Sequence, residues 1–488
     1  MLRILTGRAG SGKTAWTLAR MKEEGPRRPQ LLVVPEQASF EMEVRLCRDN
    51  GNQAAAYGEV LSFTRLANRV LTRTGGAARP VLDEGGRLLT MYDALRGVQA
   101  NLTVYALPAR KPEFLASLLT TMDELKSCCV TGGQLLQVGE ETEGLDGEKL
   151  RDLGLIFGAY EALTARGAMD PRDRLTRLAE GLQQTPFFQD RDVYLDGFTD
   201  FTPQQGLVLE QMLRQAPTVT VSLTWDAAED EGIFAPAEQT IARLKRLAAR
   251  VGCPVTEVTC VSDHPQRTPP LAHVEQALFR PPLAPYQGPW DNSVVVRVLP
   301  SPREEVAWAA GEIRELVRRG EVRCRDIVIT ARNIDPYWEQ LEGIFAQYEL
   351  PLFQADKTDI LQKPLFTLVT AALDTVTGGY LYEDVFRYLK TGLAGLTPEE
   401  CDRLENYVLT WDLWGSRWTA SQGWTLHPGG YHQQFTPEDE AELADLNALR
   451  LRVITPLEHL RKQAGGTLGQ QVLALYRFLE EIQAPEAL

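Results

Sequence analysis

Cysteine and histidine are scarce in this sequence of 488 residues, which holds seven cysteines and five histidines. No two cysteines form a C-x-x-C pair, and the histidines are scattered, so no spacing typical of a zinc site is present. The cysteines stand at positions 47, 128, 129, 253, 260, 324 and 401. This usage is typical of reduced thiols, and we expect a cytoplasmic protein.

Long hydrophobic runs are missing as well. No apolar stretch approaches the ~18 residues of a membrane-spanning helix, so we expect no membrane partner. The N-terminus lacks the charged and apolar regions of a signal peptide, and internal repeats and long low-complexity tracts are absent. With 44% hydrophobic and 24% charged residues, the composition is that of a globular protein. The length predicts roughly two to four domains.

Positive charge is in short supply over the whole chain, whose net charge is −15. That balance by itself argues weakly against a nucleic-acid partner. Residues 1–80 are different, because they hold 13 Lys and Arg against 7 Asp and Glu. This basic segment is either an ordinary solvated surface or a surface that contacts a phosphate backbone.

The N-terminus carries a complete phosphate-binding motif. Residues 1–6 form an apolar run that predicts a strand, and a helical pattern starts at Ala15. Between them the sequence reads G-x-x-x-x-G-K-S/T, the pattern of a P-loop. A chance match in a glycine-rich turn is the alternative, but the flanking strand and helix favour a P-loop. The motif consists of Gly7, Arg8, Ala9, Gly10, Ser11, Gly12, Lys13 and Thr14.

Each part of this motif has a chemical task. The glycines let the backbone curl so that successive N–H groups point at phosphate oxygens, and the helix N-terminus adds partial positive charge. Lys13 supplies a charge near the β- and γ-phosphates, and the Thr14 hydroxyl can hold Mg²⁺. The sequence therefore predicts an α/β nucleotide-binding fold that takes ATP and Mg²⁺.

Polar side chains follow the next two predicted strands. Residues 31–34 are apolar, and Gln37 and Ser39 come directly after them. Ligand contacts in open parallel sheets lie at the carboxyl ends of strands, so both are candidate contacts to bases or phosphates. Ser39 can equally cap a helix that begins near residue 40. Both roles are compatible.

A third strand, at residues 59–61, precedes a helix that combines an aromatic ring with positive charge. Phe63 opens this helix, Arg65 follows, and Asn68 lies toward its polar side. An aromatic beside arginines suits single-stranded nucleic acid, where stacking and charge act together. A core role for Phe63 is the alternative.

A fourth strand, at residues 192–195, ends in Asp196. A nucleotide-binding fold needs a carboxylate for Mg²⁺ at such a strand end, and Asp196 is our candidate. An ordinary turn acid is the alternative. A further strand is expected at residues 218–224.

The remaining pattern indicates several domains. Residues 83–168 are mostly helical and predict an insertion into a first P-loop domain over residues 1–285, whose proline-rich end at 263–289 is typical of a linker. A second α/β unit is expected to start over 292–360, and 361–488 should be mainly helical. The strands expected in the second unit lie at residues 294–299, 326–332 and 352–353.

Five stretches together resemble the UvrD-like superfamily 1 helicases and, more closely, the AddB family. They are LTGRAGSGKT, VVPEQASFEME, VLSFTRLANRVLTRTGG, VYLDGFTDFTPQQ and DIVITARN, in the order expected for the family. AddB proteins pair with AddA in the bacterial ATP-dependent helicase–nuclease that processes double-strand breaks for homologous recombination. The resemblance implies P-loop, RecA-like parallel sheet domains with helical insertions.

The sequence departs from this resemblance in two ways. Active helicases of the superfamily carry an acid pair in D-E-F-Q-D-T-N-P-x-Q, whereas Gly197 replaces the glutamate here. Without that water-polarising group we expect weak hydrolysis or none. AddB proteins are also much longer, and their 5′–3′ exonuclease domain and iron–sulfur cluster lie in the part that this chain lacks. We therefore expect the N-terminal portion of the family, without nuclease activity.

The resemblance implies a subunit that scans single-stranded DNA for the Chi sequence. An ATP-driven translocase active by itself is the alternative, and a small-molecule P-loop kinase or a scaffold is a third. The PEQ, SFTR and DGFTDF stretches argue against the third, because phosphorylation of small molecules needs none of them. By matching motif positions, the DNA site would consist of Gln37, Ser39, Phe63, Arg65, Asn68 and Phe201.

Overall fold

The computed structural model describes residues 1–74, 79–108, 111–226, 232–261, 267–278, 282–353, 363–431 and 433–487. The chain divides into two compact units, Met1–Arg297 and Val298–Leu488. In these described ranges, no helix is both long enough and apolar enough to cross a lipid bilayer.

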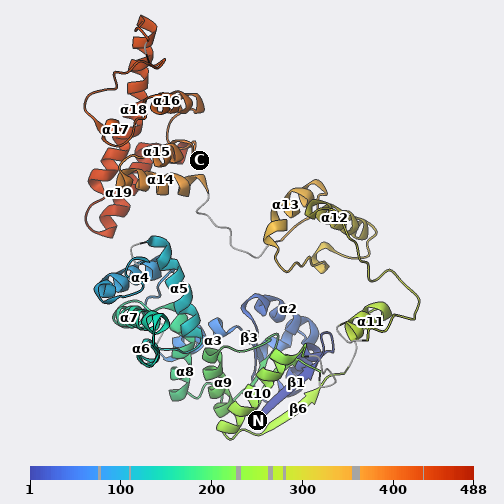
Figure 1. Cartoon of the computed structure of the whole chain (residues 1–488). Helices are drawn as coiled ribbons and strands as arrows, with labels where there is room; N and C mark the ends of the chain where they lie inside the picture. The colour runs from blue at the N-terminus through green and yellow to red at the C-terminus, as the bar shows by residue number, and fades with distance from the viewer. Residues whose placement is uncertain are drawn as a thin grey trace. The chain divides into compact units, whose positions relative to one another are not determined.

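A parallel sheet forms the centre of the first unit (Figure 1). Within the described residues it has six strands in the order β3-β2-β4-β5-β1-β6, and all neighbouring pairs are parallel. This sheet confirms the predicted α/β fold class. The strands are β1 (Leu2–Gly7), β2 (Gln30–Val33), β3 (Gly58–Leu61), β4 (Asp192–Leu195), β5 (Val219–Thr224) and β6 (Val255–Thr259).

The edge strand β6 was not predicted from the sequence. Its sequence, VTEVT, is half polar, and most of its side chains remain exposed or half-buried. Only its pairing with β1, in which Leu2 lies opposite Val255, defines it as a strand. An edge strand of this kind carries little hydrophobic pattern, because it buries only part of each face.

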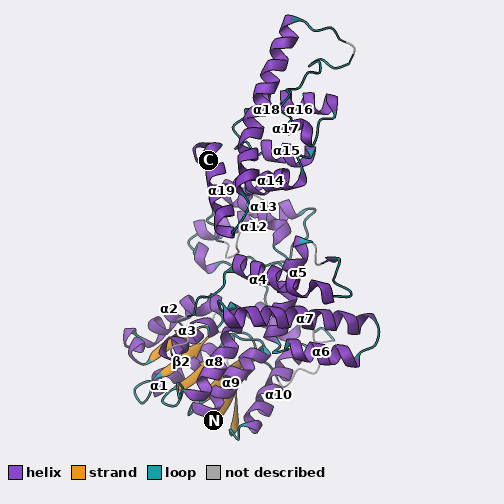
Figure 2. Cartoon of the chain, turned by 90° about the vertical axis from the view of Figure 1, so that its left-hand side faces the viewer, coloured by secondary structure: helices purple, strands orange, loops and turns teal. Residues whose placement is uncertain are grey.

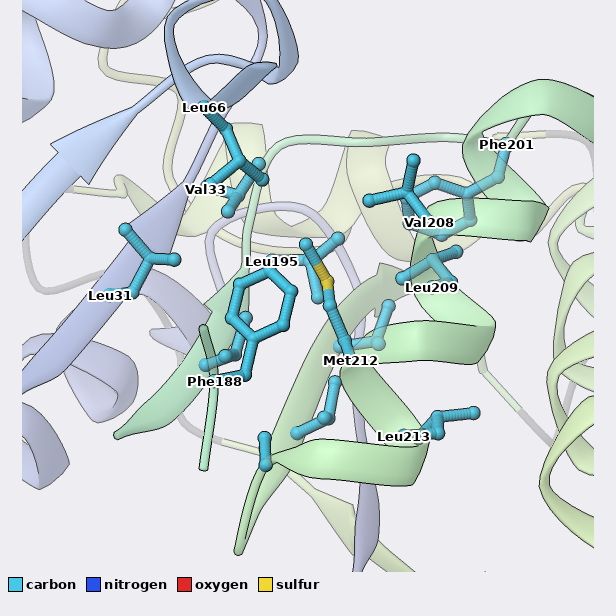
Figure 3. Close-up of a cluster of buried hydrophobic side chains, with 14 of the residues drawn as sticks. Leu31, Val33, Leu66, Phe188, Leu195, Phe201, Val208, Leu209, Met212 and Leu213 are labelled. Atoms are coloured by element: carbon cyan, nitrogen blue, oxygen red, sulfur yellow. The ribbon is translucent and has the colours of Figure 1, made fainter. Parts of the chain in front are cut away.

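Helices cover both faces of the sheet, because successive strand residues point to opposite sides. On one face Leu32, Val34 and Tyr194 pack beneath the first two helices. On the other, Val33 and Leu195 belong to a larger core that Figure 3 shows in close-up. The first face is covered by α1 (Lys13–Glu24) and α2 (Ser39–Asn50), and the second by α3 (Phe63–Thr74), α8 (Arg174–Gln184), α9 (Pro203–Gln215) and α10 (Ala235–Arg250).

A helical block with its own core stands between β3 and β4 in the chain. Its helices α6 and α7 come into direct backbone contact at glycines. A Cβ at Gly147 would lie 1.9 Å from the Thr142 carbonyl oxygen, and one at Gly154 would lie 3.0 Å from that of Gly132. Larger residues at these positions would force the two helices apart. The helices are α4 (Glu84–Val98), α5 (Pro112–Ser127), α6 (Gly132–Glu141) and α7 (Leu145–Arg166).

A buried ionic network joins this block to the entry of α8. Asp170 is fully buried and accepts hydrogen bonds from Lys126 Nζ at 2.9 Å and from the Tyr160 hydroxyl at 3.0 Å. Arg87 lies 3.3 Å from the same carboxylate, and the backbone N–H of Arg172 donates to it at 2.9 Å. Burial by itself raises the pKa of Asp170, but the charge of Lys126 and these hydrogen bonds outweigh it and hold the pKa below the usual value.

The described residues of the second unit form helices and loops, and the strands drawn in orange in Figure 2 belong to the first unit. Two clusters provide its cores, one around α12 and α13 and one around the helices that follow. The helices are α12 (Pro302–Arg318), α13 (Trp338–Gln347), α14 (Pro364–Gly378), α15 (Tyr382–Leu389), α16 (Pro398–Trp411), α17 (Ser416–Thr419), α18 (Pro437–Gln463), α19 (Leu468–Glu481) and α20 (Ala484–Ala487).

The strand predictions for the second unit were wrong. Residues 294–299, 326–332 and 352–353 form no β pairing in the described structure. Val298 and Val328 are largely exposed, at 94% and 80%. An apolar segment becomes a strand only when a neighbouring strand satisfies its N–H and C=O groups, and these segments have no such neighbour among the described residues.

Candidate functional site

The loop between β1 and α1 has the backbone of a phosphate-binding turn. Gly10 and Gly12 have φ angles of 74° and 87°, in the left-handed region that favours glycine. A Cβ at Gly7 would lie 2.3 Å from Ser11 Oγ and 2.6 Å from the Cys260 carbonyl oxygen. The loop therefore requires its glycines. Its residues and the helix N-terminus suit an anionic ligand.

Lys13, the first residue of α1, points back over this loop. Its Nζ donates to the carbonyl oxygens of Gly7 and Arg8, both at 2.8 Å. Burial lowers the pKa of Lys13, while the nearby Asp196 and Cys260 act in the opposite direction. The ammonium is thus partly desolvated within the loop, where its charge would act more strongly on an anion than it would in bulk water.

Asp196 follows β4, which lies two strands from β1 with β5 between them. Its carboxylate is buried and accepts a hydrogen bond from Ser222 on β5. Because β4 and β1 both run parallel to β5, Asp196 and the loop after β1 follow strand ends at the same edge of the sheet, and the negative charge of Asp196 acts to raise the pKa of Lys13. Mg²⁺ commonly takes one or two carboxylates together with phosphate oxygens, and Thr14 and Asp196 fit this donor set.

Gly197 occupies a backbone conformation that disfavours the glutamate of active helicases. Its φ is +82°, and a Cβ there would lie 3.3 Å from Pro35 Cδ. A side chain at this position would therefore strain the turn. The replacement of the motif glutamate by Gly197 is therefore matched by a backbone conformation that favours glycine.

The six candidate DNA residues fall into two groups by exposure. Ser39, Phe63 and Phe201 are buried, and the two rings are only 6% and 7% exposed. Ser39 Oγ donates to the Glu36 carbonyl oxygen at 2.5 Å, so its hydroxyl is used within the turn that opens α2. The exposed members are Gln37, Arg65 and Asn68.

The two buried rings both pack against the half-buried ring of Phe198. Phe198 lies 5.6 Å from Phe63 and 5.2 Å from Phe201 between ring centroids. Figure 3 shows Phe201 beside Val208 of α9 in the hydrophobic core. These contacts favour the core role that the sequence left open for Phe63.

Phe40 is an exposed aromatic that was not among the candidates predicted from the sequence. It is 77% exposed and follows Ser39 at the start of α2. One turn later, Glu43 accepts a hydrogen bond from Arg65 Nη1 at 2.6 Å, which brings α2 and α3 together. An aromatic three residues after Gln37 was a signal available in the sequence, but burial had to be known before Phe40 could be distinguished from Phe63.

The DGFTDF stretch after β4 has several structural contacts. Asp200 accepts hydrogen bonds from the Phe201 N–H at 2.6 Å and from Thr240 Oγ1 at 2.9 Å, and it also pairs with Arg243. Thr202 and Gln205 form a reciprocal capping box at the start of α9. These bonds fix the loop that carries Asp196 relative to α9 and α10.

A helix within the predicted linker contacts the P-loop. Residues 263–289 contain α11 (Pro269–Ala277), although 262–266 and 279–281 lie outside the described residues. Arg8 Nε donates to Glu275 Oε1 at 2.7 Å, and Arg267 donates to the Ala9 carbonyl oxygen at 2.8 Å. Part of the expected linker is therefore a helix that packs against the loop between β1 and α1.

The fold and the loop define an α/β P-loop protein of RecA-like type. The chain belongs to the family described as "ADDB, N-terminal", whose model matches residues 4–275. It is 35% identical to the B subunit of the ATP-dependent helicase/deoxyribonuclease from Moorella thermoacetica, across 100% of this chain and 44% of that protein. The protein of the same name from Acetivibrio thermocellus is 33% identical, across 99% of this chain and 44% of its own length. The chain thus spans less than half the length of these relatives.

Proposed function

We propose that this chain is the helicase-like, DNA-binding part of a bacterial ATP-dependent helicase–nuclease that acts in double-strand break repair by homologous recombination. One observation carries the proposal: the P-loop and the exposed Gln37 and Arg65 follow strands of a single parallel sheet. Parallel strands end at one edge, so nucleotide and DNA contacts share that edge. The names of the two relatives support the same role.

The nucleotide would bind through residues 7–14, with Mg²⁺ held by Thr14 and Asp196. The left-handed glycines, the half-buried Lys13 ammonium over the loop carbonyls and the position of Asp196 at the same edge of the sheet support this assignment. The site lacks the motif glutamate, because Gly197 stands there. Nucleotide binding with weak turnover is therefore the expected behaviour, and this disfavours an autonomous translocase.

The DNA would be a single strand read for the Chi sequence. Arg65 can make a bidentate contact to guanine, and Gln37 can pair with a base edge. Asn68 would add a polar contact, and Phe40 an exposed stacking surface. Ser39, Phe63 and Phe201 would support this surface from inside, because their side chains are buried.

The partner would be an AddA-like helicase–nuclease subunit in a cytoplasmic heterodimer. The two relatives are themselves named as subunits, which supports a partner of some kind. Residues 292–360 would begin a second RecA-like domain, and 361–488 a helical insertion. The family's nuclease domain and its iron–sulfur cluster would belong to the rest of the longer proteins.

The test uses Gln37→Ala and Arg65→Ala in the complex with the partner subunit. Both variants should lose the response to Chi, while unwinding of DNA without Chi stays near that of the wild type. Arg48→Ala is the matched control, because Arg48 is an exposed arginine of α2 paired with Asp49. An unchanged Chi response in both variants would place the reading site elsewhere.

A further inference from the structure

A row of arginines runs along the exposed side of α3, starting at Arg65 and continuing past the residues assigned to sequence reading. Arg65, Arg69 and Arg73 are spaced four residues apart, and all three are exposed. Four residues of α-helix rise about 6 Å, so their positions repeat along the axis at a roughly constant interval. Such a row can follow one polymer backbone whose charges also repeat.

Two acidic side chains pair with this row of three arginines, so the surface along α3 keeps a net positive charge. Arg65 pairs with Glu43 at 2.6 Å, and Arg69 pairs with Glu59 of β3 at 3.3 Å. Arg73 instead lies over the ring of Phe187, with its guanidinium carbon 5.3 Å from the centroid. The two ion pairs are largely exposed, and pairs of this kind are weak, so an incoming phosphate can replace the carboxylate at little cost.

The row lines an open groove of about 400 Å³ between α3 and the edge strand β3. Three arginines and a single glutamate face it, in a chain whose net charge is −15. Two neutral hydrogen-bonding side chains, Asn68 and Thr72, lie between the arginines. This combination of charge and polar groups suits the phosphates and sugars of a nucleic-acid backbone.

We propose that Arg69 and Arg73 form a phosphate track that continues the single-stranded DNA path from Arg65 along α3. The proposal rests on the DNA-binding function proposed above and adds contacts that do not read sequence. α3 starts at the carboxyl end of β3 and runs back along it, so the track leads away from the strand-end loops that face the bases. DNA that occupies those loops is held on this side by its backbone.

The experiment measures binding of a fluorescent oligothymidine to the 488-residue chain by anisotropy, between about 50 and 200 mM salt. The double variant Arg69→Gln/Arg73→Gln should bind roughly tenfold more weakly at the lower salt. Its slope of log affinity against log salt should fall by about 1.4, since each single-strand phosphate contact contributes about 0.7. Arg69→Lys/Arg73→Lys should keep most of the slope, because the charges remain.

Arg214→Gln is the matched control. Arg214 is an exposed arginine near the end of α9 in an ion pair with Glu210, and it is not among the residues that line the groove along α3. It should bind as the wild type does. Thermal unfolding of every variant should match that of the wild type, because the changed side chains are exposed.

The outcomes separate this inference from the proposed function. If the wild type binds the oligomer with a clear salt dependence and the double glutamine variant matches it, the track is wrong and the DNA-binding function stands. If the wild type does not bind, both fail. The same double glutamine variant can also be titrated with duplex DNA and with oligoglutamate. If it binds oligothymidine normally and loses affinity only for one of these two, the single-strand track is wrong.

Discussion

The ammonium of Lys13 lies over the carbonyl oxygens of its own loop, where phosphate oxygens would approach it. Lys13→Ala should weaken ATP binding by roughly tenfold or more, about 1.4 kcal/mol at least. Isothermal calorimetry on the two proteins measures the difference. Lys22→Ala, at the exposed end of the same helix, is the control. Equal ATP affinity of the Lys13→Ala protein and the wild type would refute the phosphate site.

Burial separates the roles of three phenylalanines. Phe63→Ala and Phe201→Ala should each destabilise the fold by about 3–5 kcal/mol, because they leave cavities in the core. Phe40→Ala should change stability by no more than about 0.5 kcal/mol. It should instead cost about 1–3 kcal/mol in binding to single-stranded DNA, through the loss of one stacked base.

Urea unfolding and oligomer titration measure these two effects separately. A Phe40→Ala protein with normal DNA affinity would remove this ring from the binding surface. A Phe63→Ala protein that has normal stability but fails to bind DNA would indicate that Phe63, and not Phe40, stacks on a base.

At the scale of elements, the buried network around Asp170 joins α4, α5 and α7 to the entry of α8. Asp170→Ala leaves Arg87 and Lys126 without this buried counter-charge, and it should cost about 3–5 kcal/mol. Asp146→Ala is the control, since Asp146 is exposed and forms a surface ion pair with Lys149. Urea denaturation of the three proteins tests the difference.

This network also predicts a direction for acid unfolding. The folded-state pKa of Asp170 is lowered, so its contribution to stability is fully present above the unfolded pKa, near 3.9. The contribution is lost as the pH falls through the folded value. The wild type should therefore lose its advantage over Asp170→Ala below about pH 4. An advantage that grows with acid would contradict this sign.

At the scale of the whole molecule, binding and turnover of nucleotide should be separable. The chain alone should show no DNA-stimulated ATPase at typical enzyme rates, about 1–10³ s⁻¹. Gly197→Glu should not restore it, because the positive φ at this position holds a side chain in a strained conformation. Rapid ATP hydrolysis by the wild type that disappears in Lys13→Ala would contradict the expectation that this chain hydrolyses ATP weakly or not at all.

The sequence by itself determined the P-loop, the buried strands and the family, because these depend on local patterns. Residues 1–14 combine a strand, glycines, lysine and threonine in consecutive positions, so their chemistry is readable without the fold. The continuous apolar runs of β2 and β4 likewise follow from burial on both faces of a parallel sheet. The replacement of the motif glutamate by Gly197 was likewise identified from its place in the sequence motif, without the fold.

Only the tertiary structure decided which side chains are accessible and which segments pair. Phe63 and Phe40 both open a helix after a strand, yet one is buried and the other exposed, because the neighbours that cover a ring come from distant β4 and α9. The largely polar residues of β6 form a strand because their backbone pairs in parallel with that of β1. The apolar residues 294–299 form no strand, since they have no paired neighbour in the described chain. Strand pairing and burial depend on two segments that lie far apart in the chain. A local sequence pattern describes one of these segments and does not show which other segment will contact it.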